Sequence, residues 1–284
     1  MEKLRVFTAK QKIDNLLHSR KENQTWKEFE KIKPNLEGKT ILVILDGNRR
    51  YATKLGLEEK IGHAMGAKTA KELARFLLSL KMNVVFWGFS PDNWQRDPDE
   101  IKNIFHLANS TLEEFTEEMN QNNVRIKHLG AKDKLPQYLI NTIQISEQTT
   151  ESNSGPFFQF ALDYSGRDEI DRAATKVLQG VINGSITLNP NDGTLHDSKM
   201  ARGEGKTFFE YIKQASDDEG EAYEIDLVVR PGGEKRLSAF GSRADYSEQF
   251  FLDKKFPELT SIDFAKVLVA FSKKDRRFGG NSKS

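Results

Sequence analysis

The chain has 284 residues, which is enough for one large α/β domain or two small ones and for a substantial hydrophobic core. Its 43 basic and 42 acidic residues nearly cancel, so the overall charge gives no case for nucleic-acid binding, and any preference for phosphate must be local. There is no cysteine, which excludes disulfides, thiolate nucleophiles and cysteine metal sites and fits a cytoplasmic protein.

Residues 1–38 are highly charged and carry apolar residues at loosely helical spacing, which predicts an N-terminal helical extension. They contain no signal-like apolar block, and no stretch of the chain approaches the roughly 18 apolar residues of a membrane-spanning helix. Pro34 and Gly38 interrupt the helical pattern before the first strand. We therefore expect a covering extension followed by one main domain at 39–284.

The first strand of the main domain is predicted at residues 41–45, an uninterrupted apolar run typical of a buried parallel strand. Asp46, Gly47 and Asn48 follow it with the turn and N-cap chemistry that starts a helix. In an open α/β sheet the junction between strand end and helix start is the usual binding crevice, and free amide groups there favour phosphate. An ordinary strand–turn–helix junction remains the alternative at this point.

The segments that follow alternate between apolar runs of strand length and helices with apolar residues three and four positions apart. Strands are predicted at 83–89, 124–129, 157–162, 226–230 and 249–252, and helices at about 62–78, 101–119, 139–145, 165–181 and 264–271. The segment 183–224 is rich in Gly, Asn, Asp and Lys and predicts one or two helices joined by loops. This alternation indicates a single α/β domain with a mostly parallel sheet of about six strands, covered on both faces.

Several predicted strands end in polar or charged residues, and in a parallel sheet these ends lie along one edge. The collected residues are Asp46, Asn48, Arg50, His63, Ser90, Asn93, Arg96, Arg230, Arg236 and Ser238, with Glu248 beyond them. Guanidinium groups bind phosphate oxygens in a bidentate way, and glycine lets the main chain approach closely. Two separated carboxylates suit Mg²⁺, which usually keeps water and substrate phosphate in its shell. Diphosphate with Mg²⁺ is therefore the favoured ligand.

Plain roles compete with these assignments. His63 alone would more often cap or pack, Trp94 would more often be a core or rim aromatic, and the basic tail around Arg277 would more often be solvated. No phosphate-binding Gly-x-x-x-x-Gly-Lys-Ser/Thr loop and no His-Glu-x-x-His pair is present, so ATP binding and zinc hydrolysis are poorly supported.

Five separated motifs together resemble the cis-prenyltransferases, the family of undecaprenyl and dehydrodolichyl diphosphate synthases. They are Asp46-Gly47-Asn48-Arg49-Arg50-Tyr51-Ala52 with Gly62-His63-x-x-Gly66; Phe89-Ser90-Pro91-Asp92-Asn93-Trp94-x-Arg96; Tyr164-Ser165-Gly166-Arg167; Arg230-Pro231-Gly232-Gly233-Glu234-x-Arg236-Leu237-Ser238; and Arg277-Phe278-Gly279-Gly280. They occur in order along the chain, and as a set they are highly specific.

The resemblance implies a homodimer whose α/β domain encloses an apolar tunnel. It implies a reaction that joins isopentenyl diphosphate to an allylic prenyl diphosphate with a new cis double bond. Asp46 would assist Mg²⁺ and the departure of the allylic diphosphate, Glu248 would contribute to the metal site, and Asn93 and Trp94 would belong to the segment that closes over the reacting carbons. A long product would favour peripheral contact with a membrane. The residues that the resemblance implies for substrate binding are Gly47, Asn48, Arg49, Arg50, His63, Ser90, Arg96, Arg230, Arg236 and Ser238, with Arg277 and Gly279 reaching over from the partner subunit.

Three positions depart from the family pattern and bear on the substrate. Glu59 stands where many members have an arginine for the allylic diphosphate, and a carboxylate there would repel that group unless it faces away. Pro231 replaces a usual threonine, and Lys235 stands where some members have a metal-contacting histidine. Glu59 and Pro231 motivate one alternative, a relative that couples prenyl groups irregularly or uses another acceptor. A second alternative, from a different class, is a non-catalytic subunit that supports a separate catalytic chain; the presence of Asp46, Asn93 and Arg236 speaks against it.

Overall fold

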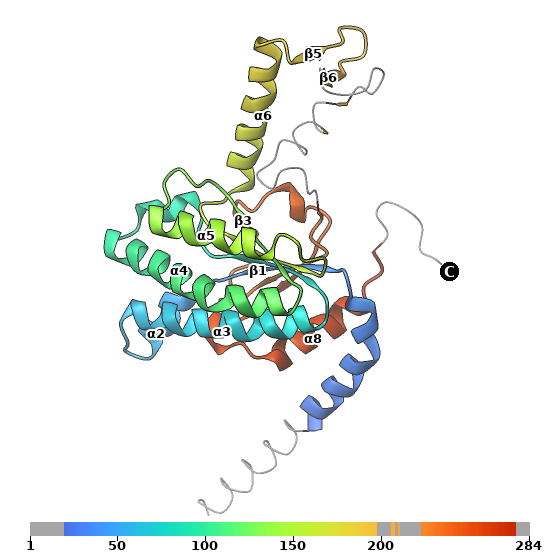
Figure 1. Cartoon of the computed structure of the whole chain (residues 1–284). Coiled ribbons are helices and arrows are strands. Elements are labelled where there is room, and N and C mark those ends of the chain that lie inside the picture. The colour runs from blue at the N-terminus through green and yellow to red at the C-terminus, as the bar shows by residue number, and fades with distance from the viewer. Residues whose placement is uncertain (1–19, 198–205, 208–209, 211–222, 277–284) are drawn as a thin grey trace, which may run out of the picture.

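A six-stranded sheet in which every pairing is parallel forms the centre of the protein (Figure 1). The computed structural model describes residues 20–197, 206–207, 210 and 223–276. The strand order is β3-β4-β2-β1-β7-β8. The strands are β1 (Thr40–Ile44), β2 (Asn83–Trp87), β3 (Arg125–Leu129), β4 (Phe157–Ala161), β7 (Leu227–Arg230) and β8 (Glu248–Phe251). The predicted single α/β domain with a six-stranded parallel sheet is confirmed.

The two faces of the sheet are covered differently. Successive β1 residues alternate between faces, so Ile41 and Val43 join one core cluster while Leu42 and Ile44 join another. The first and larger cluster lies under long helices. These helices are α3 (Glu59–Ser79), α4 (Pro98–Gln121), α5 (Gln137–Thr150) and α8 (Ser261–Ser272). The short helix α2 (Asn48–Lys54) packs on α3. The second cluster is closed mainly by side chains from connecting segments, among them Tyr164 and Phe240.

The N-terminal part of the described chain also packs on the first cluster. Residues 20–32 are helical and continue into η1 (Lys33–Leu36). Phe29 is buried, and its ring lies 5.7 Å from that of Phe76 on α3, with Trp26 edge-on to both. The predicted helical extension therefore has a helical, core-packed portion, while the boundary between residues 38 and 39 stays a prediction. None of the described helices is long and apolar enough to cross a membrane.

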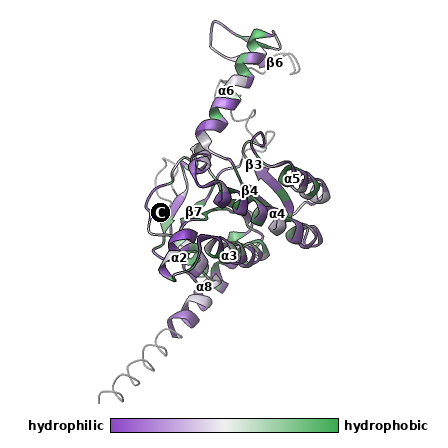
Figure 2. Cartoon of the chain, turned by 90° about the vertical axis from the view of Figure 1, so that its left-hand side faces the viewer, coloured by the Kyte–Doolittle hydropathy of each residue, from purple (hydrophilic) through white to green (hydrophobic). Residues whose placement is uncertain are grey.

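The helix α6 (Gly166–Ile182) leaves the body of the molecule and carries a small hairpin at its far end (Figures 1 and 2). The hairpin consists of β5 (Ile186–Leu188) and β6 (Leu195–Asp197), which pair antiparallel. The prediction of helices joined by loops is therefore wrong for residues 186–197, because three-residue strands are too short to produce a readable alternation. Residues 198–205, 208–209 and 211–222 lie outside the described part.

Candidate active site

The carboxyl end of β1 starts the site. β1 ends at Ile44, and the chain turns through Gly47, whose φ of 102° lies in the left-handed region, into α2. A Cβ at Gly47 would approach the backbone of Lys255 to 3.2 Å, so a side chain there would meet a second obstacle. This turn leaves the Asp46 carboxylate at the sheet edge with 26% of its side chain exposed.

Two arginines hold the Asp46 carboxylate. Arg50, one helical turn later, donates from Nη2 to Oδ1 at 2.7 Å, and Arg230, at the end of β7, donates from Nη2 to Oδ2 at 2.9 Å. Burial raises the pKa of Asp46, but the hydrogen bonds and charges of Arg230 and Arg50 outweigh that effect and leave the pKa below its ordinary value. The carboxylate is therefore ionised at neutral pH and is fixed in orientation.

Arg230 is itself fixed by the loop that follows it. Its side chain is 6% exposed, and Nη1 donates to the Arg236 carbonyl at 2.6 Å and to Ser238 Oγ at 2.8 Å. Ser238 adopts a φ of 54°, which is unusual for a residue with a side chain. The loop thus turns back onto the guanidinium group and presents its polar atoms at the same edge as Asp46.

The glycines of the same loop allow Arg50 to approach. Arg50 Nη1 donates to the Gly232 carbonyl at 2.8 Å and to Glu234 Oε1 at 3.2 Å. Gly232 has a φ of 95°, and a Cβ there would lie 2.8 Å from Arg50 Nη2. Glu234 also accepts from Arg236 Nη1 at 2.5 Å, so this carboxylate bridges two of the arginines.

A polar pocket opens among these groups. Its wall combines the ends of β1, β2 and β7 with the segment after β2. The lining residues are Ile44, Leu45, Asp46, Arg50, Trp87, Gly88, Phe89, Ser90, Asp92, Asn93, Arg96, Arg230, Glu234, Arg236, Ser238 and Ala239. Four arginines, Arg50, Arg96, Arg230 and Arg236, line this pocket and suit a highly charged anion.

The segment after β2 is held by its own side chains. Asn93 accepts at Oδ1 from the Ser90 amide at 3.0 Å, within the 3₁₀ turn η2 (Pro91–Gln95). Trp94 donates from Nε1 to Asp163 Oδ1 at 2.8 Å, and its ring lies 5.2 Å from the ring of Phe89. Asp163 is buried with a φ of 50°, so a strained, buried carboxylate anchors the tryptophan.

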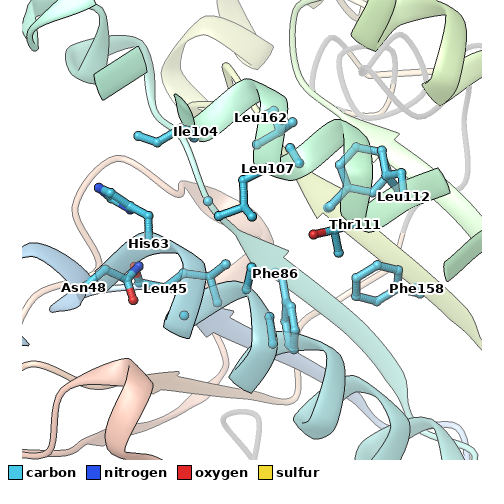
Figure 3. Close-up of a pocket in the computed structure, with 16 residues that line it drawn as sticks. Leu45, Asn48, His63, Phe86, Ile104, Leu107, Thr111, Leu112, Phe158 and Leu162 are labelled. Carbon is cyan, nitrogen blue, oxygen red and sulfur yellow. The ribbon is translucent and has the colours of Figure 1, made fainter. Parts of the chain in front are cut away.

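An apolar pocket lies next to the polar one, between the sheet, α3 and α4 (Figure 3). Leu45 and Gly88 line both pockets, so the two are contiguous. His63 and Asn48 lie at one end of the apolar pocket, and Phe158 lies toward the other. The full lining is Leu45, Asn48, His63, Gly66, Ala67, Ala70, Phe86, Gly88, Ile104, Leu107, Ala108, Thr111, Leu112, Phe158, Phe160 and Leu162. The expected tunnel stays a prediction; the observed feature is this pocket.

One carboxylate, that of Glu100, contacts three of the predicted site residues. Glu100, in the first turn of α4, accepts from Arg96 Nη1 at 3.0 Å and from Arg49 Nη1 at 3.2 Å, and its Oε1 lies 3.2 Å from His63 Nε2. Burial lowers the pKa of His63 and outweighs the opposing effect of the Glu100 hydrogen bond and charge. Glu59 lies 3.4 Å from Arg49 Nε, so the carboxylate expected to repel a diphosphate has a cationic partner.

Most of the predicted residues meet at this edge of the sheet, with three exceptions. Arg277 and Gly279 lie outside the described residues. Glu248 begins β8 opposite Leu227, at the amino end of the strands, whereas Asp46 follows the carboxyl end of β1. Within one chain, therefore, Glu248 does not share a metal site with Asp46, and the two-carboxylate site assumed for Mg²⁺ is not assembled in a single subunit.

Sequence reasoning missed three residues of the site: Glu100, Glu234 and Asp163. Glu234 belongs to the motif at residues 230–238, but the sequence did not indicate a role for it. Glu100 follows Arg96 by four positions, the spacing of a helical ion pair, and that spacing was a usable signal. The contact between Asp163 and Trp94 joins residues 69 positions apart, and no local pattern reveals it.

The donor atoms at the site suit a metal ion most of whose ligands come from water and substrate phosphate. Among the described residues, no group of three His, Asp or Glu side chains is placed to hold a metal ion. Asp46 offers one ionised carboxylate beside the arginines. Mg²⁺ is commonly bound through one or two carboxylates while water and substrate phosphate complete its shell. Asp46 therefore fits Mg²⁺ that arrives with a diphosphate, and it does not fit a metal held by protein alone.

Known proteins share both the sequence and the fold. A family model described as putative undecaprenyl diphosphate synthase matches residues 44–279. A tritrans,polycis-undecaprenyl-diphosphate synthase (geranylgeranyl-diphosphate specific) of Thermoplasma volcanium is 32% identical over 255 residues, 88% of this chain and 92% of that protein. A ditrans,polycis-undecaprenyl-diphosphate synthase ((2E,6E)-farnesyl-diphosphate specific) of Buchnera aphidicola is 32% identical over 262 residues, 91% of this chain and 97% of that one.

A solved structure agrees with these relatives. The lavandulyl diphosphate synthase from Lavandula x intermedia, in complex with dimethylallyl diphosphate, superimposes with a TM-score of 0.76 and 26% sequence identity, covering 86% of this chain and 99% of that one. Because the family model and the relatives cover most of the chain, this protein belongs to the undecaprenyl diphosphate synthase family of prenyltransferases.

Proposed function

We propose that the chain condenses isopentenyl diphosphate with an allylic prenyl diphosphate to give a Z-polyprenyl diphosphate. One observation carries the proposal: the polar pocket around Asp46, Arg50 and Arg230 is contiguous with the apolar pocket through Leu45 and Gly88. Such a pair of pockets suits an amphiphile with a diphosphate head and a hydrocarbon chain. The growing chain would extend through the apolar pocket as through a tunnel.

The chemistry requires stabilisation of charge at the boundary between the pockets. The C1–O bond of the allylic substrate breaks, and the diphosphate leaves with the electron pair. The terminal alkene carbon of isopentenyl diphosphate bonds to C1 of the allylic substrate. Loss of a proton from C2 of the isopentenyl unit then forms the cis double bond. Arg50 and Arg230 would neutralise charge that grows on the leaving group, and the apolar wall would exclude water. Mg²⁺, when bound with the diphosphate at Asp46, would supply further neutralisation.

The donor is expected to be an allylic diphosphate of medium length. The relatives named above are specific for geranylgeranyl and farnesyl diphosphate. The test is incubation of the purified chain with Mg²⁺, labelled isopentenyl diphosphate, and dimethylallyl, geranyl, farnesyl or geranylgeranyl diphosphate. We expect label in a longer product with at least one donor and none without Mg²⁺. No incorporation with any donor would sink the proposal.

Irregular coupling is the second candidate. The likeness to a lavandulyl diphosphate synthase that holds dimethylallyl diphosphate favours it. In this reaction two five-carbon allylic units join, and isopentenyl diphosphate is not consumed. The same assay separates the candidates when the label is moved to dimethylallyl diphosphate, because a ten-carbon product formed without isopentenyl diphosphate identifies irregular coupling.

We also propose a homodimer and peripheral membrane contact for long products. The exposed apolar face of α6, with Leu178 and Ile182, suits a second copy of the chain.

A different surface suits the membrane contact. Leu55, Leu57 and Ile61 are exposed at the junction of α2 and α3, close to the site, and could contact the apolar part of a lipid surface. Flotation with phospholipid vesicles tests the membrane contact, which charged substitutions at these three residues should abolish.

A further inference from the structure

We infer that Glu100 is a positioning residue for the diphosphate-binding end of the two pockets. The inference rests on the proposed function and goes beyond it, since it assigns a role to a side chain that lines neither of the two pockets. Glu100 receives contacts from three different elements: Arg49 on α2, His63 on α3, and Arg96 just before α4. Its side chain is 8% exposed and that of His63 is 12% exposed, whereas Arg96 is 30% and Arg49 is 48% exposed, so the cluster reaches from the protein interior to the surface.

The two carboxylate oxygens of Glu100 contact different residues. Oε1 accepts from Arg96 Nη1 at 3.0 Å and lies 3.2 Å from His63 Nε2, whereas Oε2 accepts from Arg49 Nη1 at 3.2 Å. Arg96 lines the polar pocket and His63 lines the apolar pocket. One carboxylate therefore fixes a residue of each pocket relative to the other, at the place where the head and the chain of an amphiphile would separate.

Glu100 is itself well supported. It stands in the first turn of α4, where the helix dipole favours a negative charge. The preceding N-cap, Asp97, accepts from the amides of Asp99 and Glu100 at 2.8 and 3.4 Å and so fixes the start of the helix. A carboxylate held in this way can order long arginine side chains before the substrate arrives, which removes part of the entropy cost of binding.

Charge and position predict opposite results when Glu100 is neutralised, and this opposition makes the inference testable. Removing an anion from the neighbourhood of an anionic ligand strengthens binding if charge alone matters. Releasing Arg96, Arg49 and His63 from their orientation weakens binding if position matters. We expect position to dominate, because the hydrogen bonds are direct while the carboxylate itself lines neither pocket.

The experiment measures equilibrium binding of inorganic diphosphate and of farnesyl diphosphate by calorimetry, in the full chain with Mg²⁺ and without turnover. Glu100→Gln is expected to weaken farnesyl diphosphate binding about tenfold. Glu118→Gln is the matched control, because Glu118 pairs with Arg75 between the same two helices but away from both pockets. The control is expected to stay within about twofold of the wild type.

A double-mutant cycle locates the effect. In an Arg96→Gln background, Glu100→Gln is expected to weaken binding much less than tenfold, because the hydrogen bond between Arg96 and Glu100 is already absent. Equal or tighter binding by Glu100→Gln in the wild-type background would overturn the inference, as would full additivity with Arg96→Gln. If Glu100→Gln does not fold, Glu100→Asp carries the same test, because it keeps the charge and withdraws the carboxylate: weaker binding supports the inference and unchanged binding overturns it.

The binding assay also separates this inference from the proposed function. A chain that binds farnesyl diphosphate but never incorporates isopentenyl diphosphate would refute the proposed condensation and leave the Glu100 result standing. Conversely, normal condensation by Glu100→Gln with unchanged KM for the allylic substrate would refute only the positioning role.

Discussion

At the scale of single residues, Asp46 is the most important side chain for the proposed reaction. Its carboxylate is shared between Arg50 and Arg230, and Arg230 is nearly buried. Loss of the Asp46 charge would leave the Arg230 guanidinium with only the Arg236 carbonyl and Ser238 hydroxyl as described partners. The substitution therefore removes a carboxylate that is proposed to assist Mg²⁺ and also disturbs an arginine that is proposed to bind substrate.

We expect Asp46→Asn to reduce kcat by about a hundredfold while the Kd for the allylic diphosphate changes by less than about tenfold, because the lost stabilisation is felt mainly in the transition state. Steady-state kinetics and calorimetry on the same preparation check this. Asp171→Asn, on the exposed side of α6, is the control. Wild-type turnover in Asp46→Asn would remove Asp46 from its assigned role.

At the scale of elements, the packing of α2 against α3 positions the turn that is proposed to bind phosphate. Gly62 on α3 faces the Asn48 carbonyl, and an added Cβ would come within 2.2 Å of that oxygen. Gly66 faces the Asn48 side chain, with Oδ1 2.4 Å from an added Cβ. Two glycines one turn apart thus let the start of α2 lie directly on α3.

Gly62→Ala is expected to lower the free energy of unfolding by about 1–2 kcal/mol, although alanine favours helix formation by about 1 kcal/mol, because the backbone of Asn48 must move. Urea unfolding measures the change. Lys60→Ala, with an exposed side chain on the same helix, should differ little from the wild type. A stabilised Gly62→Ala variant would show that the contact is not tight.

A second element-scale prediction concerns the start of α8. Asp263 accepts from the amide and hydroxyl of Thr260 at 3.0 and 2.9 Å and from Lys254 at 2.8 Å. Burial raises the pKa of Asp263, but these bonds outweigh it and the pKa lies below its ordinary value. The unfolded chain therefore takes up the proton first as the pH falls, so stability from this carboxylate is complete above about pH 4 and is lost below it.

Asp263→Asn is expected to cost about 1 kcal/mol of unfolding free energy at pH 7, in the range of lost helix caps. The difference from the wild type should shrink as the pH falls from about 4 through the lowered folded pKa. Urea midpoints between pH 7 and pH 3 check this. A pH-independent difference would contradict the assignment of the effect to the charge.

At the scale of the whole molecule, α6 and its hairpin stand apart from the body (Figure 2), and they expose apolar side chains. Ile182 is 85% exposed and Leu178 and Leu188 are each 57% exposed. The base of α6 is firmly attached, because buried Glu169 accepts from Arg243 and from the Tyr164 hydroxyl. A rigid base with an apolar outer face is typical of a surface that another chain covers.

We predict that the wild type sediments as a dimer and that Leu178→Glu with Ile182→Glu sediments as a monomer at micromolar concentration. Ile145→Glu on α5 is the control, since Ile145 is 61% exposed but lies on the body of the molecule. Analytical ultracentrifugation distinguishes the species. A dimer that survives the double substitution would place the interface elsewhere.

The strands and long helices could be predicted because burial imposes continuous apolar runs on parallel strands and three-four spacing on helices. Asp46, Arg50 and Arg230 could be predicted from their motifs and from the rule that strand ends converge. The hairpin at 186–197 escaped, since its strands are very short. The role of Glu100 escaped because it arises from contacts with Arg49 and His63, 51 and 37 positions away, that only the folded chain creates.

The place of β1 in the sheet has a consequence for synthesis of the protein. Its partners are β2, which follows closely in the chain, and β7, so the Asp46–Arg230 contact joins residues 184 positions apart. A chain emerging from the ribosome can pair β1 with β2 early but leaves the other edge of β1 open until residues 227–230 appear. The Asp46–Arg230 contact is therefore completed late, and until then β1 presents an apolar, unpaired edge that favours association with other chains.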